Sequence, residues 1–206
     1  MGKQFDKEMK FWTKEEFQRF IVARANKRRS YYAFEMLYWC EIRDGELLAL
    51  TIEDFDFAKR TVRINKTFQK LEDKDHIRTP KTQKSNRTII IPDFLSKEME
   101  MYIDSLYGYR PTDRIFQITK SFLHHALDRE AKAAGVPAIR IHDLRHSYLS
   151  LLINMGYSAL AIGERLGHES IKVTYLYAYL FLTVQTDMKK LGAEREEILD
   201  VPKEEK

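Results

Sequence analysis

The sequence has little cysteine and no long apolar run. Cys40 is the only cysteine among the 206 residues, so an internal disulfide is excluded and a reducing compartment is expected. The longest apolar stretch, residues 175–182, is far too short to cross a bilayer, and the amino terminus lacks the apolar core of a signal peptide. These absences predict a cytoplasmic protein without a membrane partner.

Acidic residues are sparse in one basic segment. Between Lys59 and Arg87 there are ten lysines or arginines against three acidic residues, which gives the segment a charge of +7 in a chain of net charge +4. A basic segment on a nearly neutral body is typical of a protein that binds a polyanion such as nucleic acid. A solvated, lysine-rich hairpin has the same composition, so charge alone leaves both interpretations open.

Helix and strand signals predict a mainly α fold with one small antiparallel β-sheet, in the α+β class and in one domain. Thr13 and Glu16 have the spacing of a capping box, which predicts a helix near the start of the chain. A turn is expected at 54–56, and β-branched patterns at 61–67 and 87–91 predict strands, with a loop or a further strand between them. Other helices are expected over 31–41, 45–50, 94–106, 121–134, 142–155 and 184–191, with two more starting at Ser158 and Ser170.

The start of the helix expected over 142–155 carries two basic side chains on one face. His142 and Arg145 are three residues apart, so they project together from the first turn, where free N–H groups and the helix dipole favour an anion. A guanidinium adds the bidentate contacts that suit a phosphate. The plain alternative is a surface histidine and arginine on an ordinary amphipathic helix.

The same stretch is also close to a zinc motif. His142 and His146 have the spacing of the His-Glu-x-x-His pattern of zincins, with Asp143 in place of the glutamate. No third ligand follows at short range, so a metal site is the minor interpretation.

Other basic and phenolic residues are spread along the chain. Arg43 follows an apolar helix and needs a partner; an ion pair with Glu46 is the plain interpretation, and a ligand phosphate is the other. Lys81 lies at the mouth of the basic segment, where a solvated lysine or a proton donor would fit, and His168 follows a glycine as a loop residue or a presented side chain. Three tyrosines at 175, 177 and 179 suit aromatic packing, but at helical spacing they cannot all face one way, so one should be accessible.

Taken in order along the chain, these motifs resemble the tyrosine recombinases, the phage-integrase type of site-specific DNA recombinase, and most of all the integrases of phages and conjugative transposons. Four boxes carry the resemblance: Arg43-Asp-Gly-Glu-Leu-Leu-Ala-Leu50, Thr79-Pro-Lys-Thr82 before Arg87-Thr-Ile-Ile-Ile-Pro92, His142-Asp-Leu-Arg145-His-Ser, and Leu166-Gly-His168. They are similar to the family's first arginine box, its hairpin lysine, its His-x-x-Arg box and its second histidine. Tyr177 lies nine residues past that histidine, where many members carry the nucleophile.

The resemblance implies an enzyme that cleaves and rejoins DNA through a 3′-phosphotyrosine intermediate, with neither cofactor nor metal. In such a mechanism the two arginines and the second histidine hold the phosphate, the lysine protonates the leaving 5′-oxygen, and the first histidine assists proton transfer from the tyrosine. The catalytic residues expected from the motifs are Arg43, Lys81, His142, Arg145, His168 and Tyr177.

The chain departs from the family pattern in two ways. Members often have a histidine two residues after the nucleophile, where this chain has Tyr179, and others place the nucleophile at the position of Ala178. Tyr175 and Tyr179 therefore stay open as nucleophiles beside Tyr177. Members also usually carry amino-terminal DNA-binding regions, so we expect a catalytic domain alone at 11–191, a polar tail at 192–206, and no amino-terminal DNA-binding domain.

The resemblance also implies partners. Double-stranded DNA is the expected substrate, and the family acts as a homo-tetramer that exchanges a C-terminal helix; residues 184–191 are the candidate, and an ordinary packed helix is the alternative. A mobile element in bacteria, a location at the nucleoid when bound to DNA, and accessory recombination proteins follow from the same resemblance. Two other functions stay open: an integrase-derived DNA-binding protein that no longer cleaves, and a zinc-dependent hydrolase built on His142 and His146.

Overall fold

The computed structural model describes residues 10–72, 74–79, 86–158 and 161–162. Its helices are α1 (Lys14–Val22), α2 (Arg28–Trp39), α3 (Asp44–Ala49), the 3-10 helix η1 (Ile52–Asp54), α4 (Asp93–Asp104), α5 (Lys120–Ala134) and α6 (Asp143–Asn154). Its strands are β1 (Phe55–Asp56), β2 (Thr61–Ile64), β3 (Thr67–Leu71), β4 (Lys74–Arg78) and β5 (Arg87–Ile90). The predicted mainly helical α+β class is confirmed. The helices predicted near the tyrosines and at 184–191 lie outside the described residues.

Helix α1 begins where the capping box predicts. The hydroxyl of Thr13 accepts a hydrogen bond from the Glu16 N–H at 3.2 Å, and the Glu16 carboxylate accepts one from the Thr13 N–H at 2.8 Å. The box satisfies N–H groups that a helix start otherwise leaves unpaired. With its start fixed, α1 buries Phe17 and Phe20 on the face that meets the rest of the molecule.

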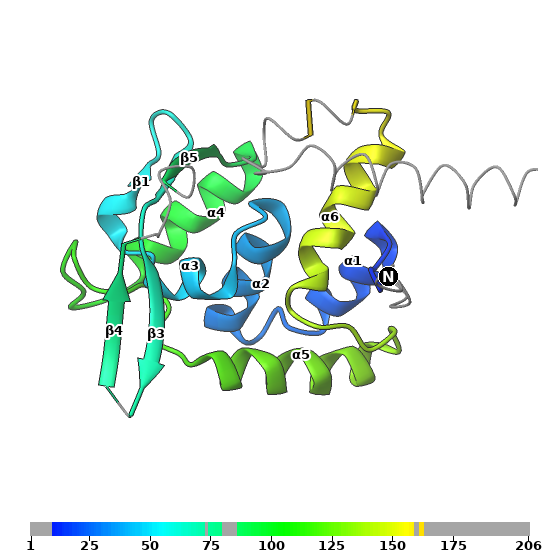
Figure 1. Ribbon diagram of the computed structural model, residues 1–206, viewed down its shortest axis with the longest axis horizontal. Coiled ribbons are helices and arrows are strands. Elements are labelled where there is room, and N and C mark those ends of the chain that lie inside the picture. The colour runs from blue at the N-terminus through cyan, green and yellow to red at the C-terminus, as the bar shows by residue number, and fades with distance from the viewer. Residues whose placement is uncertain (1–9, 73, 80–85, 159–160, 163–206) are drawn as a thin grey trace, which may run out of the picture.

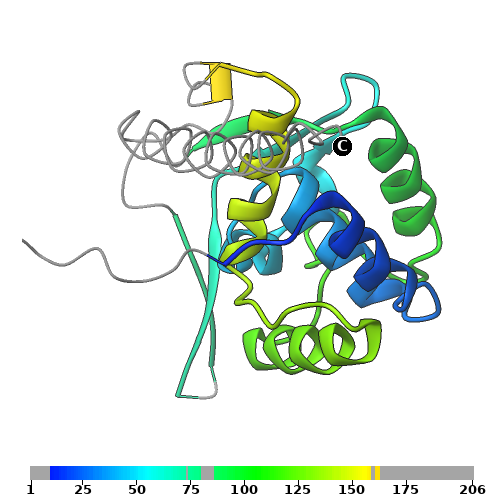
Figure 2. The same cartoon turned by 90° about the vertical axis from the view of Figure 1, so that its right-hand side faces the viewer.

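Helix α2 lies in the middle of the helical core and contacts α1, α3, α4 and α6 (Figures 1 and 2). Its Tyr38 ring stacks on Phe17 of α1 with centroids 3.7 Å apart, and its Phe34 ring meets Phe20 edge-on at 5.0 Å. Burial of one large apolar side chain contributes about 1.5–3 kcal/mol. This aromatic layer therefore fixes α2, and with it the segment that follows α2 and enters the site.

The strands form two small antiparallel sheets, where the sequence predicted one. The order of the first sheet is β1-β2-β5, with Ile64 opposite Arg87, and β3 pairs with β4 in a separate hairpin that turns at Glu72. Between β2 and β3 the ammonium of Lys66 lies 2.8 Å from the buried carboxylate of Asp54, which anchors the chain where it leaves the first sheet. The hairpin lies at one side of the molecule, with β3 next to α3 (Figure 1).

The hairpin is joined to α3 by a close backbone contact. A Cβ added at Gly45 would lie 2.5 Å from the Thr67 hydroxyl and 3.2 Å from the Phe68 carbonyl oxygen, so glycine is required for this approach. The guanidinium of Arg114 lies over the Phe68 ring, 3.9 Å from its centroid, and forms an ion pair with Asp75 at 3.1 Å. Strand β3 is therefore held against the helix that follows Arg43.

Helix α5 ends at Gly135, which adopts the left-handed conformation with φ of 64°, as its stop signal predicts. The chain then crosses to α6, where the Ser147 hydroxyl accepts a hydrogen bond from the Trp12 N–H at 2.8 Å. This bond ties the segment before α1 to the middle of α6. Within the described ranges, no helix is both long and apolar enough to cross a membrane.

Candidate active site

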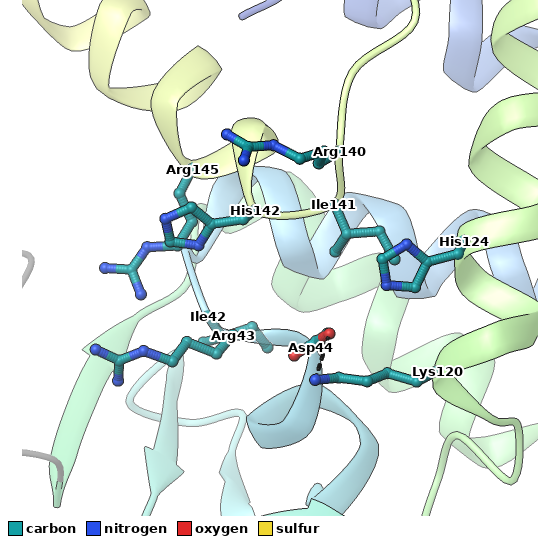
Figure 3. Close-up of a pocket in the computed structure, with 9 residues that line it drawn as sticks. All are labelled: Ile42, Arg43, Asp44, Lys120, His124, Arg140, Ile141, His142 and Arg145. Atoms are coloured by element: carbon teal, nitrogen blue, oxygen red, sulfur yellow. Dashed lines mark ion pairs between the residues drawn. The ribbon is translucent and has the colours of Figure 1, made fainter. Parts of the chain in front are cut away.

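Three of the predicted catalytic residues line one pocket. Arg43, His142 and Arg145 come from the start of α3 and the start of α6, and they surround a cavity of about 400 Å³. In Figure 3 the ends of Arg43 and Arg145 point to the same side of the pocket, beside the His142 ring. The other lining residues are Ile42, Asp44, Lys120, His124, Arg140 and Ile141.

Arg43 is the residue before the first turn of α3 and keeps much of its side chain in solvent. Its Nη1 donates to Glu46 Oε1 at 3.0 Å, and its backbone N–H donates to Glu46 Oε2 at 2.9 Å. The ion pair predicted from the sequence is therefore present. The Arg43 side chain is nevertheless 56% exposed, so the guanidinium is available to a ligand as well.

Glu46 has a second, stronger partner that the sequence did not reveal. Arg87 on β5 donates from Nη1 to Oε1 at 3.1 Å and from Nη2 to Oε2 at 2.9 Å. Burial alone would raise the pKa of Glu46, but the hydrogen bonds and charge of Arg87, with those of Arg43, hold it below its usual value. Glu46 is therefore ionised and links the first sheet to α3.

Arg145 is buried and faces an acidic partner of its own. Its Nη2 lies 3.4 Å from Glu41 Oε1, and only 8% of its side chain is exposed. Burial lowers the pKa of Arg145 and the charge of Glu41 opposes that effect, so the guanidinium remains charged at neutral pH. Glu41 itself has a φ of 53°, an unusual conformation for a residue other than glycine. Such strain often accompanies functional sites.

His142 lies at the start of α6, as predicted, with its ring exposed to the pocket. Burial, and then the positive charge of Arg145, lower the pKa of His142, so the imidazole is neutral at pH 7 and can accept a proton. Its ring meets that of His146 edge-on with centroids 4.8 Å apart. Burial, followed by the charge on His142, lowers the pKa of His146 to about 4.

The zinc interpretation needs Asp143 as a base, and the structure gives that carboxylate another role. Asp143 accepts hydrogen bonds from the Arg140 backbone N–H at 2.9 Å, from Nε at 3.0 Å and from Nη2 at 2.7 Å. It is 1% exposed and orients Arg140 at the pocket. Among the described residues, no three histidine, cysteine, aspartate or glutamate side chains are grouped as metal ligands.

Lys120, His124 and Arg140 line the pocket but carried no motif. Lys120 and His124 lie four residues apart at the start of α5, on the side of the pocket opposite Arg43 in Figure 3. The Lys120 ammonium forms an ion pair with Asp44 at 3.0 Å. The spacing of Lys120 and His124 shows that they share a helix face. Only the fold shows that this face meets the starts of α3 and α6.

The remaining predicted residues, Lys81, His168 and Tyr177, lie outside the described residues, as do Tyr175 and Tyr179. They stay predictions from the sequence. The described part of the pocket is lined by three guanidiniums, two imidazoles and a lysine. Its lining carboxylate, Asp44, and the nearby carboxylate of Asp143 are each paired with a cation. Chemically, such a site suits an anion with several oxygens, such as a phosphate diester.

Comparison with known proteins finds relatives that are named as integrases or recombinases. Residues 10–182 match the model of the Phage integrase family. The chain is 32% identical to the ICEBs1 integrase of Bacillus subtilis (strain 168) over 197 residues, which cover 88% of this chain and 54% of that protein. It is 29% identical to a putative prophage phiRv2 integrase of Mycobacterium tuberculosis (strain ATCC 25618 / H37Rv) over 158 residues, 72% of this chain and 42% of that protein. The chain thus spans about half the length of these relatives.

Solved structures share the fold. The Tn1549 transposon integrase (residues 82–397 in complex with circular intermediate DNA) matches with a TM-score of 0.73 and 20% identity, over 91% of this chain and 69% of that one. The XerA recombinase matches with a TM-score of 0.70 and 21% identity, over 93% of this chain and 66% of that one. The family match covers most of the chain. Arg43, His142 and Arg145, the predicted catalytic residues that the structure describes, all line the pocket. The chain belongs to the phage integrase family.

Proposed function

We propose that this chain is the catalytic domain, at residues 11–191, of a tyrosine-type site-specific DNA recombinase. The observation that carries the proposal is the convergence of Arg43, His142 and Arg145 on one pocket in a member of the phage integrase family. Relatives named as integrases and tyrosine recombinases, and a Tn1549 integrase structure with DNA, support the same reaction.

The proposed reaction is a transesterification at a DNA phosphate. The Tyr177 oxygen forms a bond to phosphorus as the bond from phosphorus to the 5′-oxygen breaks, which leaves a 3′-phosphotyrosine and a free 5′-hydroxyl. His142, which is neutral at pH 7, assists removal of the tyrosine proton, and Lys81 gives a proton to the 5′-oxygen. Because the phosphate-ester bond is conserved, the 5′-hydroxyl of another strand can reverse the step without ATP.

The arginines stabilise the charge that develops in this step. Arg145 is buried and positioned by Glu41, so it needs little reorganisation to hold a non-bridging oxygen. Arg43 reaches the pocket from α3 with an exposed end, and His168 is proposed as a further donor. Two guanidiniums on one phosphate give the bidentate recognition that lysines cannot supply.

We infer double-stranded DNA as the substrate, bound mainly through phosphates, and a homo-tetramer as the working assembly. An apolar groove of about 370 Å³ on α2 and α6, lined in part by Trp39, Leu151 and Met155, supports docking of residues 184–191 from a second copy. The site of action would be the bacterial nucleoid within the cytoplasm, with accessory recombination proteins as further partners.

Covalent trapping tests the proposal. A duplex with a nick near the scissile phosphate loses its short 5′-hydroxyl fragment after cleavage, so the protein–DNA adduct accumulates and is counted on a denaturing gel. The wild-type protein should form the adduct in the presence of EDTA, and Tyr177→Phe should abolish it. Tyr107→Phe, at a fully exposed tyrosine, is the matched control and should behave as the wild type.

The other outcomes separate the alternatives. Loss of the adduct in Tyr175→Phe or Tyr179→Phe, but not in Tyr177→Phe, would move the nucleophile. A wild-type protein that binds DNA but gives no adduct would support the inactive DNA-binding protein. Stoichiometric zinc in the purified protein, with activity abolished by EDTA, would contradict the recombinase mechanism.

A further inference from the structure

The carboxylate of Glu46 is shared unequally by two arginines. Arg87 uses both ends of its guanidinium, one on each carboxylate oxygen, at 3.1 and 2.9 Å. Arg43 gives Glu46 a single guanidinium contact, at 3.0 Å, and supplements it with its backbone N–H. The fork geometry of Arg87 therefore holds the carboxylate, while Arg43 keeps most of its donors for other partners.

Burial separates the roles of the two arginines. The side chain of Glu46 is 5% exposed and that of Arg87 is 14% exposed, whereas that of Arg43 is 56% exposed. A buried carboxylate requires compensation, and loss of one partner of a buried ion pair leaves an unfavourable charge. Arg87 supplies the compensation from within the fold, and Arg43 extends into the pocket (Figure 3).

We propose that Arg87 is a positioning residue for the pocket. By holding both oxygens of Glu46, Arg87 prevents that carboxylate from drawing the guanidinium of Arg43 away from the substrate phosphate. Arg87 is not among the residues that line the pocket, so it acts through Glu46 and not on the substrate. The inference rests on the proposed function, because it concerns how the same site holds its phosphate.

The reason lies in what Glu46 would do without Arg87. Among the described residues, Arg43 is the other side chain that pairs with Glu46. A buried, ionised carboxylate that loses its bidentate partner would gain from a second contact with Arg43. The guanidinium of Arg43 would then pair more fully with Glu46, and the substrate phosphate would lose one of its two arginine partners.

A rescue experiment separates this role from simple support of the fold. Single-turnover cleavage of the nicked duplex is measured for the wild type, Arg87→Met, Arg87→Lys, Glu46→Gln and the pair Arg87→Met with Glu46→Gln. Arg110→Met is the matched control, because it removes the same charge from an arginine that pairs with Asp113 and whose side chain is 80% exposed. Thermal unfolding of every variant is recorded.

We expect Arg87→Met to slow cleavage about tenfold or more, since loss of one donor to a transition-state oxygen has at least this effect. Arg87→Lys keeps the charge but not the fork, so it should fall between Arg87→Met and the wild type. Adding Glu46→Gln to Arg87→Met should restore most of the lost rate, because a neutral amide no longer holds Arg43. Arg110→Met should stay close to the wild type.

The inference is overturned if Arg87→Met and Arg87→Lys both cleave at the wild-type rate. It is also overturned if adding Glu46→Gln restores the cleavage rate of neither variant. Where Arg87→Met fails to fold, Arg87→Lys with and without Glu46→Gln gives the same decision. A wild-type protein that forms no adduct would refute the recombinase proposal instead. The affinity of the same variants for duplex DNA, measured by fluorescence anisotropy, then decides the inference: weaker binding by Arg87→Met that Glu46→Gln restores supports it, and unchanged binding overturns it.

Discussion

His146 makes the stability of the domain depend on pH. Its side chain is 15% exposed, and burial, followed by the charge on His142, lowers its pKa to about 4 from a usual value of 6.5. Because the folded-state pKa is depressed, the neutral form stabilises the fold fully above pH 6.5, and this stability is lost as the pH falls through 4. At about 1.4 kcal/mol for each pKa unit, the loss is about 3 kcal/mol.

His146→Gln removes this titration while keeping a polar side chain of similar length. The free energy of unfolding of the wild type, relative to that of the variant, should fall by about 3 kcal/mol between pH 7 and pH 4. Urea denaturation at several pH values measures it, and titrations common to both proteins cancel in the difference. A difference constant within about 1 kcal/mol, or an NMR titration of His146 near its usual pKa, would refute the reasoning.

Three further changes test other parts of the fold. Burial, with the nearby charge of Glu98, raises the pKa of Glu35 to about 7. The protonated carboxyl therefore contributes fully to the stability of the fold below pH 4.5, and this contribution is lost as the pH rises through 7. Relative to Glu35→Gln, the free energy of unfolding of the wild type, measured by urea denaturation, should fall by about 3 kcal/mol between pH 4 and pH 8. Gly45→Ala should destabilise the domain by about 1–3 kcal/mol in thermal unfolding, despite its better helix propensity, and Thr67→Ala in the same chain should recover part of the loss. Glu130→Gln leaves the fully buried Arg24 without its carboxylate at 3.4 Å and should cost about 3 kcal/mol in urea denaturation, whereas an unchanged midpoint would contradict the pairing.

Local patterns predicted the parts of the fold that depend on local physics. The capping box of Thr13, the glycine stop at Gly135 and the helix start at His142 depend on neighbouring residues, and all three are confirmed within about one residue. The division of the strands into two sheets depends on long-range contacts. These contacts include the close approach of Gly45 to β3, which no periodicity in the strand sequences reveals.

The site was predicted to the extent that it carries motifs. The spacing of His142 and Arg145 was compatible with a phosphate site and equally with an ordinary surface helix. Only the ordered set of boxes favoured the phosphate site and added Arg43 to it. The contact of Arg87 with Glu46 carries no local signal in the sequence, because Glu46 lies 41 residues before it. Lys120 lines the pocket because α5 packs against α3, and this packing cannot be predicted from a single sequence.

The central claim is that Arg43 and Arg145 hold the charge of a DNA phosphate. A nicked duplex with a methylphosphonate at the scissile position tests it, because a methyl group replaces one non-bridging oxygen and removes the negative charge. Arg145→Ala should cleave the ordinary phosphate about 100-fold or more slower than the wild type. On the methylphosphonate, the cleavage rates of Arg145→Ala and the wild type should lie much closer together. An Arg145→Ala protein that cleaves the ordinary phosphate at the wild-type rate, or that shows the same deficit on both substrates, would contradict the account.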